Sequence, residues 1–406
     1  MRTTRRSVIR EFASFAAGSP LVAETTPPVQ DPSIVSEQAG TIAPPEYSAD
    51  IMAPVNLHEI EQAAKKKLNQ LAYDHIAGGA ADELTLQANR EAFGRFWLRR
   101  RVMNDVSTID TKLTLLGQEL EHPILLAPAG AKPLLHPDGD RVCAHAAKHT
   151  GAIYVVNASE TMAEMSATGT APIWWSATLG HATPAEAHDY AKRSEDEGAS
   201  ALCVSVDYPY TGSRDRNARN QFDLDSIRTG EFSTGEPPRD AFQVGMLQAY
   251  TPSMTWEYLS WLHGATGLPV VVKGIVTGED AELAVDNGAN VVIVSNHGGR
   301  TLDGMSGTLD VLAEVSDAVN GRVPVLVDGG IRRGGDVLKA IALGANAVLI
   351  GRPYLWGLGA FGQQGVQRVV ELLHGELRVA MAMAGMANLA DVDRHLVQPA
   401  WEPERA

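Results

Sequence analysis

Short apolar runs alternate with longer amphipathic segments along most of the chain. The runs are rich in Val, Ile, Leu and Ala, a pattern typical of strands that are buried on both faces. They occur at Ile124–Ala129, Ile153–Ala158, Ile173–Ala177, Ala201–Val206, Val270–Lys273, Val291–Ser295, Val325–Asp328 and Ala347–Ile350. Helix-like segments follow at Asp140–His149, Thr161–Ala167, Pro184–Glu197, Trp256–Thr266, Glu279–Asn287, Leu309–Val319 and Gly335–Leu343, and a last one starts near Phe361.

This alternation predicts an α/β protein with a parallel sheet, because parallel strands need crossover connections and helices usually provide them. A doubly wound open sheet and a closed barrel both fit such a pattern. Eight strand–helix units in one chain favour the (β/α)8 TIM barrel. An N-terminal helical segment precedes the barrel, and Asn56 can cap its first helix, which runs to Asn69. Leu113 to Leu120 is interpreted as a short strand with a turn at Gly117.

The first residues differ in character from the rest of the chain. Residues 1–23 contain Arg5-Arg6 before a modest apolar stretch, with small residues near Ala23, which indicates a twin-arginine export signal. A basic tail within an otherwise cytoplasmic protein is the alternative. Residues 24–55 are rich in Pro, Ser, Thr and Ala and are interpreted as a linker, and residues 56–400 are expected to form the folded domain.

Polar side chains fall at the carboxyl ends of the predicted strands, where TIM barrels build their sites. They are Asn157, Ser205, Asp207, Lys273, His297, Asp328 and Arg352. Scattered polar residues would not all occupy this end, so the same face of the barrel is the expected site.

Composition excludes several kinds of partner. The formal net charge of −15 argues against nucleic acid and against anionic membrane surfaces. Cys143 and Cys203 lack metal-ligand spacing and are interpreted as packed, reduced thiols, so no metal site is expected.

The stretch Val294–Gly304 carries the strongest candidate chemistry. His297 and Arg300 lie on one glycine-containing loop after a buried strand. An imidazole can take a proton near neutral pH, and a guanidinium can hold a carboxylate with two hydrogen bonds. Together these groups suit a small acid that loses a proton.

The sequence SNHGGRTLDG within this stretch resembles the signature of the FMN-dependent α-hydroxy-acid oxidase and dehydrogenase family, which includes glycolate oxidase, lactate oxidase and mandelate dehydrogenase. The resemblance runs from about Asn56 to His395 and implies the barrel fold and an FMN cofactor. A nicotinamide cofactor is less favoured, because no GxGxxG stands between a strand and a helix. The resemblance implies FMN contacts at Pro128, Ala129, Gly130, Asn157, Ser176, Ser205, Lys273, Ser295, Asp328, Gly329, Gly330, Arg332, Gly351 and Arg352.

The reaction that the resemblance implies is oxidation of an L-2-hydroxy acid to a 2-oxo acid. His297 is expected to act as the base, with Asp207 stabilising the imidazolium and Lys273 the reduced flavin. Arg300 and Arg214 are expected to bind the carboxylate. The electron acceptor is left open between oxygen, a quinone and a cytochrome, and a homo-oligomer, such as a tetramer, is expected.

Two positions depart from the family pattern. His75 stands where the family usually has a carboxylate-binding Tyr, and Thr178 where a second Tyr ends the third strand. Ser176 stands where a flavin-contacting Gln is usual, although a shift of one residue in this alignment stays open. These departures keep a second hypothesis, an FMN-binding barrel with a different reaction or a non-standard substrate.

Overall fold

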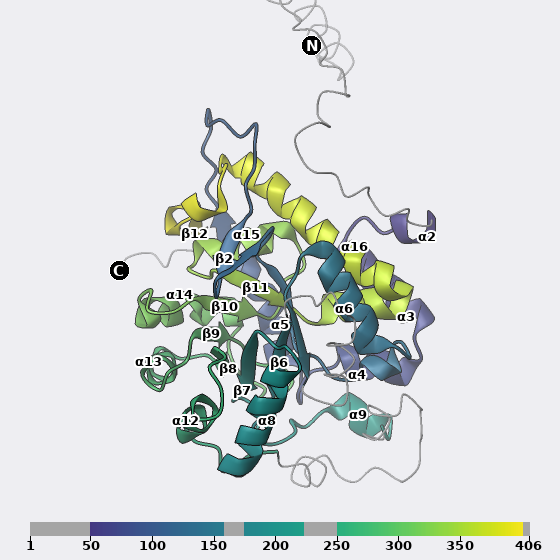
Figure 1. The fold of residues 1–406 in the computed structure, drawn as a ribbon. Coiled ribbons are helices and arrows are strands. Elements are labelled where there is room, and N and C mark those ends of the chain that lie inside the picture. The colour runs from purple at the N-terminus through teal and green to yellow at the C-terminus, as the bar shows by residue number, and fades with distance from the viewer. Residues whose placement is uncertain (1–48, 158–173, 223–249, 401–406) are drawn as a thin grey trace, which may run out of the picture. The chain divides into compact units, whose positions relative to one another are not determined.

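Eight parallel strands close into a barrel in the computed structural model, which describes residues 49–157, 174–222 and 250–400. Hydrogen-bonded neighbours follow in chain order, and the last strand pairs with the first (Figure 1). The strands are β4 (Ile124–Leu126), β5 (Tyr154–Asn157), β6 (Trp174–Thr178), β7 (Ala201–Ser205), β8 (Val270–Ile275), β9 (Val291–Val294), β10 (Val325–Asp328) and β11 (Ala347–Ile350). The predicted α/β TIM barrel is therefore confirmed, and the open-sheet alternative is wrong.

Successive side chains of each strand point alternately into the barrel and towards the surrounding helices. Leu125, Val155 and Trp175 belong to a cluster that fills the interior, whereas Ile124 and Val156 belong to a second cluster shared with the helices. Because both faces are buried, the strands need to be apolar throughout, which explains the unbroken hydrophobic runs in the sequence.

Helices cover the outside of the barrel, as Figure 1 shows. The helices that follow barrel strands are α6 (Gly139–Thr150), α8 (Pro184–Asp196), α9 (Asp215–Arg219), α12 (Glu257–His263), α13 (Gly278–Asp286), α14 (Thr308–Val319), α15 (Gly334–Ala342) and α16 (Arg352–Ala384). The expected helix at Thr161–Ala167 lies outside the described residues. No helix in the described ranges combines the length and apolar character needed to cross a bilayer.

Helix α16 starts earlier than the sequence pattern predicts. Its first residue is Arg352, directly after β11, rather than a residue near Phe361. Gly362 has a φ of 60° and marks a kink, so the predicted helix is the second part of a longer one. Arg352 therefore lies in the first turn of a helix, at the end where free backbone N–H groups favour anions.

The N-terminal segment contains α2 (Ala49–Met52), α3 (Leu57–Lys67), α4 (Gln70–Ala77), α5 (Leu84–Glu91) and the 3-10 helix η3 (Ala92–Arg95). The Asn56 side chain accepts a hydrogen bond from the Glu59 backbone N–H at 3.0 Å, as expected for a cap of α3. Ile51 in α2 is only 1% exposed, so the folded unit begins before the predicted boundary at Asn56. Figure 1 shows α3 beside α16, with which it packs.

Two short strand pairings and several 3-10 turns complete the described part of the fold. The predicted strand near Gly117 is a hairpin of β2 (Leu113–Leu115) and β3 (Gln118–Leu120). Strand β1 (Phe96–Leu98) pairs with β12 (Val397–Pro399), which joins the N-terminal segment to the end of the described chain. The last 3-10 turns are η5 (Leu389–Asp391) and η6 (Arg394–Leu396), and η4 (Lys132–Leu134) follows β4.

Candidate active site

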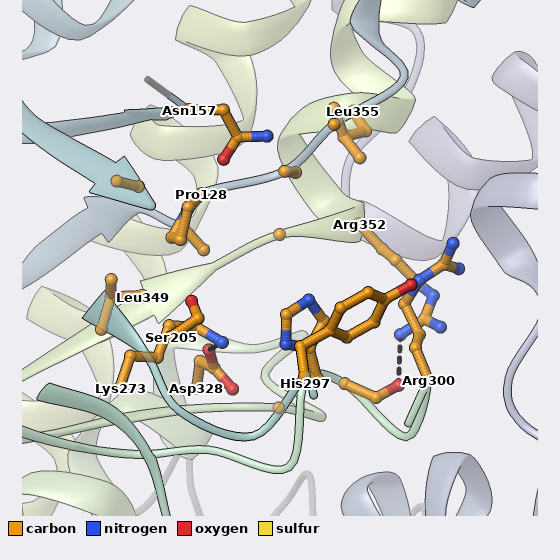
Figure 2. A pocket seen from close by; sticks show the side chains of 18 of the residues that line it. Pro128, Asn157, Ser205, Lys273, His297, Arg300, Asp328, Leu349, Arg352 and Leu355 are labelled. Atoms are coloured by element: carbon orange, nitrogen blue, oxygen red, sulfur yellow. Dashed lines mark hydrogen bonds and ion pairs between the residues drawn. The ribbon is translucent and has the colours of Figure 1, made fainter. Parts of the chain in front are cut away.

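A cavity of about 520 Å³ lies at the carboxyl ends of the barrel strands. Most of the predicted site residues line it: His75, Pro128, Ala129, Gly130, Asn157, Thr178, Ser205, Arg214, Lys273, His297, Arg300, Asp328, Gly329, Gly330, Arg332, Gly351 and Arg352. Figure 2 shows Lys273 and Asp328 towards one end of this cavity, Arg300 and Arg352 at the other, and His297 between them. Three predicted site residues do not line the cavity, and the reason differs for each: Asp207, Ser295 and Ser176.

His297 and Asp207 form a pair at the centre of the site. The Nδ1 atom of His297 lies 3.0 Å from Oδ1 of Asp207, so the ring donates its Nδ1 proton to the carboxylate and leaves Nε2 free to accept one. Burial, with help from Lys273, lowers the pKa of His297 below its ordinary 6.5, although Asp207 opposes the shift. His297 is therefore a neutral base near neutral pH.

Asp207 stays ionised despite its burial. Burial acts to raise the pKa of the Asp207 carboxyl, but His297 and Lys273 together hold it below the ordinary value. Its second oxygen, Oδ2, is buried and has no hydrogen-bond partner among the described residues. A carboxylate in this position can stabilise the imidazolium that forms when His297 takes a proton.

The backbone around this pair is specialised. His297 has a φ of 55°, a left-handed conformation that non-glycine residues rarely adopt. A bulge in β8 leaves Gly274 opposite Asp207, and a Cβ on Gly274 would lie 2.7 Å from the Cβ of Asp207. Only glycine allows the Asp207 side chain to lie this close to β8.

Lys273 is held by a chain of buried polar groups. Its Nζ donates to Oγ of Ser295 at 2.9 Å, and the Ser295 hydroxyl donates to Oδ1 of Asp328 at 2.8 Å. Burial acts to lower the pKa of Lys273, but Asp328 and Asp207 raise it above its ordinary value, so the lysine remains a cation. Ser295 thus positions Lys273, whereas the sequence suggested a direct contact between Ser295 and the cofactor.

Arginines gather at the opposite end of the cavity. Burial and the neighbouring Arg214 and Arg352 lower the pKa of Arg300 well below its usual range. The pKa of Arg352 is lowered to about 9, first by burial and then by Arg332 and Arg214. No carboxylate within the described ranges forms an ion pair with any of these four guanidinium groups. Such a cluster is costly by itself and is suited to anionic groups of bound molecules.

The arginines are nevertheless oriented by backbone carbonyls. Nη1 of Arg300 donates to the carbonyls of His75 and Gly78, at 2.8 and 2.9 Å. Nη2 of Arg352 donates to the same Gly78 carbonyl at 2.8 Å. The end of α4 therefore fixes both side chains against the barrel, which explains why the N-terminal segment is part of the site.

His75, at the position of the missing Tyr, is a neutral hydrogen-bonding group. Its Nδ1 accepts from Nδ2 of Asn217 at 3.0 Å, which leaves the proton of the neutral ring on Nε2. The ring stacks on Phe222 with centroids 4.6 Å apart. Burial, followed by Arg300 and Arg214, lowers the pKa of His75 to about 2. An N–H donor on a fixed ring can replace a phenol as a ligand for a carboxylate.

The third barrel strand, β6, shows which of its side chains face the cavity. Trp175 and Ala177 face the barrel interior, and Ser176 therefore points outwards, where its Oγ accepts a hydrogen bond from Ser194. Thr178 reaches the cavity edge, but its hydroxyl accepts from the Gly180 backbone N–H and lies against Tyr258. Ser176 is thus directed away from the cavity, and the inward positions of β6 are Trp175 and Ala177.

Two aromatic residues of the cavity wall were missed. Tyr208, directly after Asp207, and Tyr250 both line the cavity, with ring centroids 5.1 Å apart. The sequence offered one signal: Tyr208 follows a strand end and precedes the loop that carries Arg214. That signal gives the position of Tyr208 in the chain but not the direction in which its side chain points, so the sequence could not assign this residue to the site.

The cavity fits FMN at both of its ends. Arg332 has a buried Nε without a partner in the described part of the chain, and a Cβ on Gly351 would meet no atom within 4 Å. Free N–H groups at the start of α16 complete a setting suited to a phosphate. At the other end, Lys273 supplies a fixed cation, which suits a ring system that gains negative charge on reduction.

Comparisons with known proteins agree with this geometry. The family model described as FMN-dependent dehydrogenase matches residues 64–399. L-lactate oxidase from Nostoc sp. is 42% identical over 356 residues, which cover 84% of this chain and 98% of that protein. Glycolate oxidase 3 from Arabidopsis thaliana is 37% identical over 362 residues, covering 86% and 98%. A crystal structure of mandelate oxidase with (S)-4-hydroxymandelic acid superposes with a TM-score of 0.79 at 38% identity, covering 85% and 99%.

The barrel, the cavity and these matches define an FMN-dependent oxidoreductase. The chain belongs to the FMN-dependent dehydrogenase family, whose relatives include the lactate and glycolate oxidases named above. FMN is its cofactor, as the resemblance at residues 294–304 predicted.

Proposed function

We propose that this enzyme oxidises an L-2-hydroxy acid to the corresponding 2-oxo acid, with His297 as the base. The observation that carries the proposal is a neutral imidazole lying between a guanidinium cluster and a buried lysine cation in one cavity (Figure 2). The names of the relatives, which include an L-lactate oxidase and a peroxisomal (S)-2-hydroxy-acid oxidase, support both the substrate class and the L configuration.

Each residue has a defined part in this reaction. Arg300 and Arg214 bind the carboxylate of the acid, and the Nε2–H of His75 adds one hydrogen bond to it. The free Nε2 of His297 takes a proton from the acid, and Asp207 stabilises the resulting imidazolium. FMN bound in this cavity would supply the acceptor for the two electrons and the second hydrogen that the acid loses. Lys273, fixed by Ser295 and Asp328, keeps a positive charge at the end of the cavity that suits the flavin ring.

The alternative, a different flavin reaction, rests on the loss of both usual Tyr residues. His75 compensates for the first, because it is held as a neutral donor in the same wall. Lys273, His297, Arg300 and Arg214 all line one cavity, which favours hydroxy-acid oxidation.

Anaerobic reduction of the purified holoenzyme tests the proposal. A panel of L-2-hydroxy acids with small, branched and aromatic side chains should bleach the flavin absorbance, and the matched D-enantiomers should not. A flavin that stays oxidised with every L acid, in a protein that carries one FMN, would contradict the proposed substrate class.

We infer that oxygen is the electron acceptor. The support comes from the relatives, several of which are named oxidases, whereas the family description speaks of a dehydrogenase. Hydrogen peroxide should therefore form in equal amount to the 2-oxo acid. Turnover only with an artificial quinone or with a cytochrome would overturn this inference.

We further propose that residues 1–23 direct export by the twin-arginine route, which carries folded, cofactor-loaded proteins. Arg5-Arg6 ahead of an apolar stretch supports it, and these residues lie outside the described ranges. Replacing both arginines by Lys should retain the protein inside the cell. An unchanged location would make the proposal wrong.

We also propose that the enzyme is a homo-oligomer, with a tetramer as the expected size. Val379 and Met383 lie one turn apart on α16 and are 64% and 65% exposed, an arrangement that suits burial against another copy. Light scattering of the holoenzyme tests this, and a monomer at micromolar concentration would refute it.

A further inference from the structure

Tyr208 contacts both the candidate base and a carboxylate-binding cation. Its ring lies with its centroid 4.7 Å from that of His297, at an interplanar angle of 32°. Its hydroxyl oxygen accepts a hydrogen bond from Nη2 of Arg214 at 2.7 Å. The side chain is only 8% exposed and lines the cavity. One residue thus connects two groups that serve different ends of the same small substrate.

The hydrogen bond with Arg214 leaves the proton of the phenol available. A guanidinium can only donate, so the bond occupies a lone pair of the Tyr208 oxygen and does not use its O–H. Within the described residues, the Arg214 contact is the only hydrogen bond of this hydroxyl. A buried O–H at a cavity wall needs an acceptor, and a carboxylate oxygen is the strongest one that a hydroxy acid offers.

Two other positions of the cavity lining, on α4 and at the end of β6, lack a phenol that could donate to the substrate carboxylate. The α4 position holds His75, and the inward position at the end of β6 is Ala177, so neither supplies a phenol. Tyr250 is the other tyrosine of the described lining, but it is 49% exposed and lies farther towards solvent. Tyr208 is the buried phenol of the described cavity, and it already touches Arg214.

We propose that Tyr208 is a substrate-contacting residue, whose phenol donates to the carboxylate that Arg214 and Arg300 bind, and whose ring holds the His297 imidazole in place. This inference rests on the proposed hydroxy-acid oxidation. A donor beside Arg214 fixes the rotation of the carboxylate, and the tilted ring against the imidazole restricts His297, so the acid and the base keep a common orientation. Tyr208 would then set substrate affinity through its hydroxyl and base geometry through its ring.

Three variants of the holoenzyme separate these two parts. Tyr208→Phe removes the hydroxyl and keeps the ring, and Tyr208→Leu removes both. Tyr210→Phe is the matched control, because Tyr210 lies in the same loop, is 43% exposed and is not part of the described cavity lining. FMN content and the circular dichroism spectrum of each variant report whether the fold and the cofactor site are intact.

Tyr208→Phe should raise KM for the 2-hydroxy acid about 10- to 100-fold, which is typical of losing a hydrogen bond to a charged group. The Kd for oxalate, a dicarboxylate without an oxidisable carbon, should rise by a similar factor, and kcat should change by less than about threefold. Tyr208→Leu should in addition move the acid limb of the kcat/KM profile to higher pH, because water then reaches His297 and weakens the burial that lowers its pKa. Tyr210→Phe should match the wild type in all of these.

A Tyr208→Phe enzyme with wild-type KM and wild-type oxalate affinity would overturn the proposed contact. A fall in kcat with unchanged KM would also overturn it, because the hydroxyl would then act only through His297. If no hydroxy acid reduces the wild-type flavin, the proposed function fails, and the oxalate titration still decides on Tyr208. Failure of oxalate to bind the wild-type holoenzyme would overturn the proposed carboxylate contact of Tyr208, whereas flavin reduction alone decides on the proposed function.

Discussion

The side-chain amides of Asn89 and Asn296 bond to each other twice. Nδ2 of Asn89 lies 2.8 Å from Oδ1 of Asn296, and Nδ2 of Asn296 lies 2.9 Å from Oδ1 of Asn89. Both residues are buried, and they join α5 of the N-terminal segment to the loop that carries His297. The reciprocal pair therefore fixes the loop of the base to an element outside the barrel.

Asn89→Ala should lower the free energy of unfolding by about 1–3 kcal/mol, because it removes two hydrogen bonds to the buried amide of Asn296 and one to the backbone N–H of Thr308. Urea denaturation of the holoenzyme measures this. In a double-mutant cycle with Asn296→Ala, the combined loss should be smaller than the sum of the single losses. Additive effects would show that the two amides do not act as a pair.

His297→Ala should abolish reduction of the flavin by substrate while FMN remains bound. A positioned acid–base group typically contributes about 10²–10⁴-fold in rate, and His297 lies apart from the glycine loops at Gly329 and Gly351. Stopped-flow absorbance of the anaerobic variant measures the reduction step. His75→Ala is the comparison: near-normal reduction in His297→Ala with collapse in His75→Ala would reassign the base.

The pH dependence of the wild type follows from the same residue. The base must be neutral, and burial lowers the pKa of His297 below 6.5, so kcat/KM should be constant above about that pH and fall only in more acidic solution. Initial rates at saturating acceptor between acidic and neutral pH measure the limb. An acid limb centred above pH 7 would contradict a buried, neutral His297.

Much of the fold was predictable because strands that are buried on both faces are apolar along their whole length, which can be recognised in the sequence. The eight apolar runs became the eight barrel strands, and the polar residue that ends a run, such as Lys273 or Asp328, reached the cavity. Chain order alone then determines which face carries the site, since all parallel strands end on the same side.

Where inward and outward residues of a strand do not differ clearly in polarity, the sequence could not determine which side chains point into the barrel. In the run Ile173–Ala177, consecutive Trp residues precede Ser176, so no period of two marks the inward face, and Ser176 was expected on the cavity side although its side chain points outwards. The start of α16 was missed for another reason. Pro353, two residues after Gly351, is a helix-start signal, but the last helix was expected to start only near Phe361.

Gly274→Ala should reduce kcat by at least about tenfold while FMN remains bound, because an added methyl group must displace Asp207 and because Ala is strained at a φ of 119°. Turnover at saturating substrate and the flavin content measure the two effects. Gly267→Ala is the control, since a Cβ there meets no atom within 4 Å. Wild-type kcat in Gly274→Ala would mean that the close approach of Asp207 to β8 is unnecessary for the base.

His75 should make the stability of the protein depend on pH. In the unfolded chain its pKa is 6.5, and in the folded protein burial and the arginines lower it to about 2. Below pH 6.5 the unfolded state therefore binds a proton that the folded state does not bind, so this contribution to stability is fully present above pH 6.5 and decreases as the pH falls. The decrease is about 1.4 kcal/mol for each pH unit below that value. Replacing the imidazole with a group that does not titrate should remove this decrease in stability at low pH.

The comparison is between wild type and His75→Gln, by urea denaturation at pH 7.5 and pH 5. Wild type should lose about 2 kcal/mol more of its unfolding free energy between these conditions than the variant loses. His58→Gln serves as the control for exchanging a histidine for glutamine, because His58 is an exposed histidine on the neighbouring helix α3. An identical pH dependence in wild type and His75→Gln would show that His75 gains a proton in the folded protein, and a charged imidazolium would then face the carboxylate of the substrate.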